Sequence, residues 1–158
     1  MFKVSVSAQL AKSFAPRISR QLRRAHQFVK PKLRELSVAL VGDNRMRELH
    51  NMYMGIDSPT DVLTFELDHD PRGKVLAGEV VVCVPEARRQ AKLRGTRAVD
   101  EVLLYALHGM LHLCGHDDKT AQGFKRMHAM EDRILTRLGV GPVFSKSISK
   151  SKHAGAKS

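Results

Sequence analysis

The segment from residue 98 to residue 114 constrains the fold most, because its helical pattern leaves almost no polar face. Its apolar positions are Val102, Leu103, Leu104, Ala106, Leu107, Met110, Leu111 and Leu113. A helix that is apolar nearly all round is stable only inside a core. No apolar run in the chain reaches the length of a transmembrane helix, so we expect other elements of the protein itself to cover it.

Shorter patterned segments on both sides of this helix supply the covering elements. Apolar residues that alternate or run continuously predict strands at 2–8, 36–42, 62–65 and 78–84, with a loop at 69–74. Helical spacing of apolar residues predicts helices at 13–29, 43–55, 85–94, 98–114 and 120–139. The strand at 78–84 has a continuous apolar run from Val80 to Val84, which is typical of a central strand covered on both faces.

The order of these elements predicts an α+β fold in a single domain, as does the length of 158 residues. We expect a small mixed four-stranded sheet packed against four to six helices. Part of the sheet should be parallel, because the first connections are β-α-β crossovers. Residues 1–142 should form this domain, whereas residues 143–158 lack a core pattern and predict a basic, disordered tail.

The excess of positive charge predicts a polyanionic partner. The chain carries 27 lysines and arginines against 16 acids, a formal net charge of +11, and nucleic acid is the commonest such partner. The basic helix carries Arg88, Arg89, Lys92 and Arg94; it is a candidate nucleic-acid surface, although a solvated helix face shows the same pattern. The two cysteines form no disulfide framework and no signal-peptide pattern is present, so we expect a cytoplasmic protein.

Two histidines of the apolar helix indicate a metal site. His108 and His112 are four residues apart, so their side chains lie on one face, a helical turn apart. Burying a polar group without a partner costs about 1–3 kcal/mol, and one shared metal ion would satisfy both imidazoles. Gly115 ends the helix, because glycine tolerates the left-handed conformation that turns the chain back.

The residue that completes such a site must follow this turn. Asp118 has the offset of the third ligand in zincins of the form H-E-x-x-H-x-x-G-x-x-H, and carboxylate oxygen binds zinc. His116 is the less favoured alternative, because it comes directly after the turn and is expected to point away. Asp117 is a candidate to orient a liganding histidine. We therefore predict one Zn²⁺ bound by His108, His112 and Asp118.

Three protein ligands predict a catalytic site, because they leave one position of tetrahedral zinc open to water. Zinc-bound water ionises near neutral pH and attacks esters or phosphodiesters. The metallopeptidase pattern places its general base directly after the first histidine, but this chain has Gly109 there. Peptide hydrolysis is therefore disfavoured, and no side-chain base is identified. A phosphodiester substrate fits the positive charge better than a peptide. RNA is the easier phosphodiester target, since its 2′-hydroxyl can supply the nucleophile.

The sequence resembles the YbeY family of bacterial endoribonucleases, also described as rRNA maturation factors, over about residues 35–140. "HGMLHLCGHDD" resembles the family pattern HGxLHLxGYDH, and "MGIDSPTDVLTFEL" resembles RGKDxPTDVLSFP. "AGEVVVCVPEA" and "MHAMEDRILTRLG" resemble a family strand and its closing helix. The resemblance implies a single α+β domain and a metal-dependent nuclease for single-stranded RNA. It also implies maturation of the 3′ end of 16S rRNA and ribosome quality control.

Two positions depart from the family pattern. Asp118 stands where the family has its third zinc histidine, which adds negative charge and makes the zinc a poorer Lewis acid. Met54 stands where the family has an arginine for RNA phosphate, and Arg45 and Arg47 are candidates to replace it. The alternative function is therefore a non-catalytic, ribosome-associated RNA-binding factor with a structural metal. In both cases we expect single-stranded RNA, 16S rRNA and the ribosome as partners, and neither a membrane nor DNA.

Overall fold

The computed structural model describes residues 1–143. The predicted basic tail at 143–158 lies outside these residues apart from Val143, which is 4% exposed and packs in the core. The strands are β1 (Lys3–Ala8), β2 (Glu35–Val41), β3 (Val62–His69) and β4 (Val75–Cys83). The α-helices are α1 (Ala15–Val29), α2 (Asp43–Met54), α3 (Val84–Arg94), α4 (Ala98–Leu113) and α5 (Ala121–Arg137).

The four strands form one mixed sheet in the order β1-β2-β4-β3. β1 pairs parallel with β2 and β2 parallel with β4, whereas β3 and β4 form an antiparallel hairpin. The hairpin strands are longer than the sequence indicated. The outer residues of β3, 66–69, are exposed and mostly polar, and those of β4, 75–77, are apolar but only partly buried. Asp70 closes the turn between them by accepting hydrogen bonds from the backbone N–H groups of Arg72 and Lys74, both at 2.9 Å.

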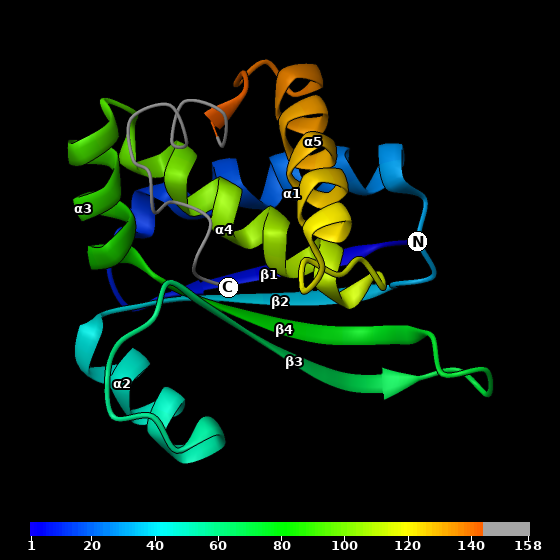
Figure 1. Cartoon of the computed structure of the whole chain (residues 1–158), viewed down its shortest axis with the longest axis horizontal. Coiled ribbons are helices and arrows are strands. Elements are labelled where there is room, and N and C mark those ends of the chain that lie inside the picture. Colours follow the sequence, from blue (N-terminus) through cyan, green and yellow to red (C-terminus); the bar gives the residue numbers. More distant parts are fainter. Residues whose placement is uncertain (144–158) are drawn as a thin grey trace.

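The sheet separates two apolar clusters, as expected for a strand covered on both faces. Val80 and Val82 of β4 face a large cluster with α1, α4 and α5, and Val81 and Cys83 face a smaller cluster with α2. Figure 1 shows α1, α4 and α5 on one side of the sheet and α2 on the other. The prediction of an α+β domain with a mixed four-stranded sheet and a buried helix at 98–114 is confirmed.

None of the described helices combines the length and apolarity that crossing a lipid bilayer requires.

Candidate metal centre

Helix α4 packs directly on the sheet through a glycine. A Cβ atom on Gly109 would lie 2.7 Å from Cγ1 of Val80 and 3.0 Å from Cγ2 of Thr64. A glutamate at this position would collide with β3 and β4 instead of reaching the side of α4 that carries the histidines. The absence of the peptidase base therefore has a packing cause.

The chain reverses at the end of α4 through Gly115, whose φ is 97°. The N–H of Gly115 donates to the carbonyl oxygen of His112 at 3.0 Å, and the N–H of His116 donates to that of Leu111 at 3.0 Å. This reversed hydrogen-bond pattern closes the helix. The turn brings the following residues back beside the last turns of α4.

Asp118 faces both histidines of α4 after this turn. Its Oδ2 lies 3.5 Å from Nε2 of His108, and its Oδ1 lies 3.6 Å from Nε2 of His112. The two imidazole rings have centroids 4.8 Å apart. The side chains of His108 and Asp118 are 8% and 10% exposed, whereas that of His112 is 26% exposed. The three predicted ligands therefore converge, with His112 nearest to solvent.

A buried glutamate of α5 orients the histidines of the centre through their Nδ1 atoms. Glu131 is fully buried, and its two carboxylate oxygens accept hydrogen bonds from Nδ1 of His108 at 2.6 Å and Nδ1 of His128 at 2.5 Å. A carboxylate in this position is typical of metal-binding histidines, because it fixes the ring and leaves Nε2 as the ligand atom. Asp117, the predicted candidate for this role, instead accepts the N–H of Lys119 at 2.9 Å.

The pKa values of these groups follow from burial and from one another. Burial alone would raise the pKa of Glu131, but the hydrogen bonds from His108 and His128 hold it below its ordinary value. Burial alone would lower the pKa of His108, but Glu131 raises it on balance. Burial and the neighbouring charge of His108 lower the pKa of His112. These shifts favour the ionised form of Glu131 and the neutral form of His112.

One atom tests whether these residues fit a metal ion. Nε2 of His108 is buried and has no hydrogen-bond partner among residues 1–143, although a buried polar group normally has one. It faces Asp118 across a gap longer than a hydrogen bond. An ion between two imidazole nitrogens and a carboxylate oxygen would satisfy it, and this donor set suits Zn²⁺. The residues fit the predicted group.

The structure adds a histidine that the sequence analysis missed. Ligand atoms of His108, Asp118 and His128 lie within 4.8 Å of one another, so this group can hold a metal ion, and His112 is not a member of it. His128 is 8% exposed, and its ring stacks near that of His108 with centroids 5.6 Å apart. The available signal was the spacing of His128 and Glu131 on one face of the last helix. His116 is half-buried and does not belong to this group.

The basic residues predicted to contact RNA lie away from this centre. Arg88, Arg89 and Lys92 are exposed on α3, at the N-terminal end of α4. The 16 residues of α4 span about 24 Å, and the histidines lie towards its other end. Arg45 and Arg47 belong to α2, on the opposite face of the sheet from α4 (Figure 1).

Several of these cations are paired with carboxylates. Arg89 donates to Asp43 at 2.8 and 3.1 Å and to Glu86 at 3.0 Å. Arg94, expected on the same exposed face, is 8% exposed and pairs with Glu101 at 3.3 Å, so that expectation was wrong. The looser surface pairs are Arg45 with Glu48 at 4.0 Å and Arg47 with Asp57 at 3.9 Å. Met54 is 60% exposed at the end of α2.

Comparison with known proteins identifies the family. The family model described as "Endoribonuclease YbeY" matches residues 3–139. The chain belongs to this family. An endoribonuclease YbeY from Moorella thermoacetica is 40% identical over 115 residues, which cover 67% of this chain and 74% of that protein. One from Geobacillus thermodenitrificans is 34% identical over 119 residues, which cover 70% and 76%.

A solved structure has a similar architecture. The solution structure of TM1509 from Thermotoga maritima superimposes with a TM-score of 0.59 at 24% sequence identity, covering 87% of this chain and 91% of that one. At this identity the likeness supports the fold alone.

Proposed function

We propose that this YbeY-family protein is a zinc-dependent endoribonuclease that cuts single-stranded RNA. The observation that carries the proposal is the convergence of His108, His112 and Asp118 around a buried Nε2 that no described residue hydrogen-bonds. We extend it to maturation of the 3′ end of 16S rRNA and to ribosome quality control in the cytoplasm. The names of the relatives support RNA as the substrate.

The residues of the centre have two roles: some orient the metal ligands, and others leave the metal site accessible to a substrate. When bound, a zinc ion lowers the pKa of water and stabilises negative charge on phosphate oxygens. Glu131 fixes the His108 ring so that Nε2 points toward Asp118. His112, the most exposed ligand, lines a cavity of about 190 Å³. A flexible single strand can place one phosphate there more easily than a rigid duplex.

Cleavage of single-stranded RNA by the purified protein tests this proposal directly. We expect cleavage that stops when a chelator is added, resumes with zinc, and is absent in His112→Ala. Cleavage that persists both in the chelated sample and in the variant would come from a contaminating nuclease. Absence of cleavage in the zinc-loaded wild-type protein would overturn the proposal.

A second candidate is a non-catalytic, ribosome-associated RNA-binding factor whose metal only holds the fold. The nearness of His128 to His108 and Asp118 favours it, because a fourth protein ligand closes a zinc site. Binding of RNA without cleavage would support this candidate.

Metal content of single variants identifies the ligands. We expect loss of bound zinc in Asp118→Ala and retention in His116→Ala and His128→Ala, measured by elemental analysis after gel filtration. Loss in His128→Ala together with Asp118→Ala would indicate a closed site of four protein ligands. Loss in His116→Ala alone would replace Asp118 by His116 as the third ligand.

A further inference from the structure

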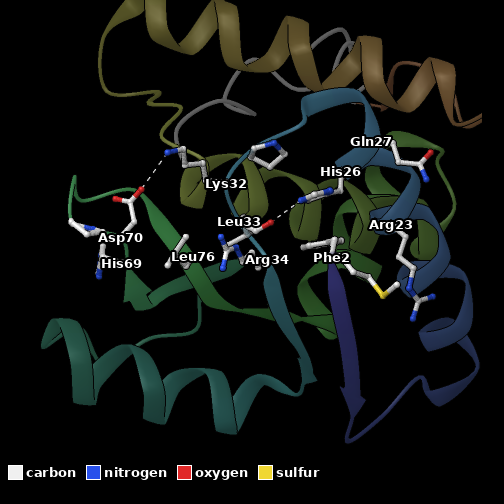
Figure 2. Close-up of a pocket in the computed structure, with 13 residues that line it drawn as sticks. Phe2, Arg23, His26, Gln27, Lys32, Leu33, Arg34, His69, Asp70 and Leu76 are labelled. Atoms are coloured by element: carbon white, nitrogen blue, oxygen red, sulfur yellow. Dashed lines mark hydrogen bonds and ion pairs between the residues drawn. The ribbon is translucent and has the colours of Figure 1, made fainter.

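A second cavity opens at the same end of the sheet as the metal centre. It has a volume of about 760 Å³ and is lined by the end of α1, the loop from α1 to β2, and the turn between β3 and β4. Figure 2 shows these three segments around it, with Arg23 on α1, Arg34 directly before β2, and Lys32 on the side of Asp70. We call this cavity the flanking cavity.

The flanking cavity adjoins the smaller cavity that His112 lines. Lys32 and Leu33 line both of them, and the smaller cavity is also lined by His112 and Gly115. A strand that leaves His112 along this surface therefore passes Lys32 and enters the flanking cavity. The arginines of α3 lie at the far end of α4 and offer no such continuous path.

The flanking cavity is positively charged. Arg23, Lys32 and Arg34 are exposed residues of its lining, and Asp70 is the one carboxylate among the lining residues. Lys32 lies 3.5 Å from Asp70, as the dashed line in Figure 2 shows, so this pair is close to neutral. The two arginines leave a net positive charge for an anion.

A flat aromatic surface lies beside these cations. The rings of Phe2 and His26 stack with centroids 3.8 Å apart and an angle of 9° between their planes. Nε2 of His26 hydrogen-bonds the carbonyl oxygen of Leu33 at 2.8 Å, which fixes the ring (Figure 2). Cations for phosphates together with a fixed aromatic surface for bases are what proteins use to bind single-stranded nucleic acid.

We propose that the flanking cavity is a nucleotide-binding subsite for single-stranded RNA on one side of the cleavage point. Arg23 and Arg34 bind backbone phosphates, and a base stacks against the Phe2–His26 pair. The subsite extends the proposed nuclease function and rests on it, since the continuity with His112 gives the strand its direction. RNA strands long enough to reach the subsite are therefore better substrates than shorter ones.

Binding of short and long strands tests the subsite. We compare single-stranded oligoribonucleotides of about 4 and about 16 nucleotides, the range of common single-strand site sizes. Their 2′-hydroxyl groups are methylated to slow cleavage, and a gel checks that they stay intact. The variant is Arg23→Ala/Arg34→Ala, and the control with the same charge loss is Lys12→Ala/Arg20→Ala, at positions that do not line the cavity.

We expect the variant to bind the long strand about tenfold more weakly than the control does. The slope of log affinity against log salt should fall by about 1.4, because each phosphate contact on a single strand contributes about 0.7. Phe2→Ala should weaken binding of the long strand without changing this slope. Circular dichroism confirms that each variant is folded.

Three results would overturn the subsite. The first is equal affinity of the variant and the control for the long strand, as expected if the cavity bound an acidic peptide instead of RNA. The second is an equal loss of affinity of the variant for both strand lengths, which would place the arginines at the metal centre itself or in the fold. The third is a decrease of the salt slope in Phe2→Ala as large as that in the double variant. Length-dependent binding without cleavage, by contrast, supports the subsite and removes only the nuclease proposal.

Discussion

Two fully buried glutamates mark the two ends of helix α4. Glu101, in the first turn of α4, accepts hydrogen bonds from Arg94 at 3.3 Å and from Thr96 at 2.8 Å. Glu131 of α5 binds His108 and His128 beside the C-terminal half of α4. Each carboxylate is 0% exposed, and each depends on partners that the fold brings to it.

The partners make the two ends different in chemistry. Guanidinium and hydroxyl groups give Glu101 its hydrogen bonds, and arginine has no lone pair for a metal. Burial outweighs these bonds, so the pKa of Glu101 is raised, whereas that of Glu131 is lowered. His108 keeps a second nitrogen that is buried and has no hydrogen-bond partner in the described part of the chain. A buried carboxylate therefore indicates a metal centre only when its partner has a lone pair left to offer.

Removing the carboxylate at the histidine end should have the largest effect. Glu131→Ala leaves two buried imidazole N–H groups without an acceptor, and breaking a buried charged network by removing one partner costs about 3–5 kcal/mol. It should also reduce zinc affinity by about 10–100-fold, as loss of the carboxylate behind a liganding histidine does. Chemical denaturation measures the first effect and competition with a zinc chelator measures the second.

The conservative variant separates these two effects. Glu131→Gln keeps the shape and one acceptor oxygen, so more of the stability should survive. Its amide group is a weaker partner for His108, so zinc affinity should still fall. Full zinc affinity in a folded Glu131→Gln protein would contradict the role assigned to Glu131.

Removing the carboxylate at the other end should affect stability alone. Glu101→Ala leaves Arg94 as a buried charge with its partner gone, which also costs about 3–5 kcal/mol. Zinc affinity and RNA cleavage per folded molecule should stay at the wild-type values, because His108 lies about two helical turns further along α4. A parallel loss of zinc affinity at a temperature where the protein is folded would show that the two ends are coupled.

The same contrast explains what the sequence could predict. The spacing of His108, His112, Gly115 and Asp118 is local, so helix geometry and one turn suffice to bring these side chains together. Glu131 reaches His108 from a separate helix, and that contact depends on how α5 packs. The pairing of Arg94 with Glu101 is likewise a packing result, which is why a run of basic residues indicated an exposed face and was wrong for Arg94.

The strands show the same difference between what a local pattern predicts and what depends on pairing and packing. The central residues of β4 carry an apolar pattern because both faces are covered, and the sequence located them. The outer part of β3 is mostly polar and that of β4 is only partly buried, so their length follows from backbone pairing in the hairpin and not from a core pattern.

A smaller loss of stability should follow from Gly109→Ala, which disturbs the packing of the C-terminal half of α4 on the sheet. In Gly109→Ala the new Cβ would approach Val80 to 2.7 Å, and overpacking of this kind costs about 1–3 kcal/mol. Alanine recovers up to about 1 kcal/mol through its helix propensity. We therefore expect a modest loss of stability by denaturation and weaker zinc binding.

A double variant shows whether the contact with Val80 is the cause. Val80→Ala removes both Cγ atoms, so Gly109→Ala should cost less in that background than in the wild-type protein. Equal costs in the two backgrounds would mean that the two positions do not interact.

The smallest effect should come from the paired surface at the α3 end. Arg89→Ala removes an exposed ion pair with Asp43, and such pairs contribute about 0–1 kcal/mol. Arg89 holds the pKa of Asp43 below its ordinary value, mainly through their hydrogen bond. A carboxyl whose pKa is lowered by folding stabilises the protein above its unfolded pKa of about 3.9. This contribution is lost as the pH falls through the lower, folded value.

The stability difference between wild type and Arg89→Ala should therefore be present at neutral pH and vanish in acid. RNA affinity should change little, because Asp43 and Glu86 already neutralise this guanidinium. Lys92→Ala, on the same helix, is the matched control. RNA affinity could instead fall as much in Arg89→Ala as in Arg23→Ala/Arg34→Ala. That result would show that α3 belongs to the RNA-binding surface. The bound strand would then have to run the full length of α4, and the two ends would serve one function after all.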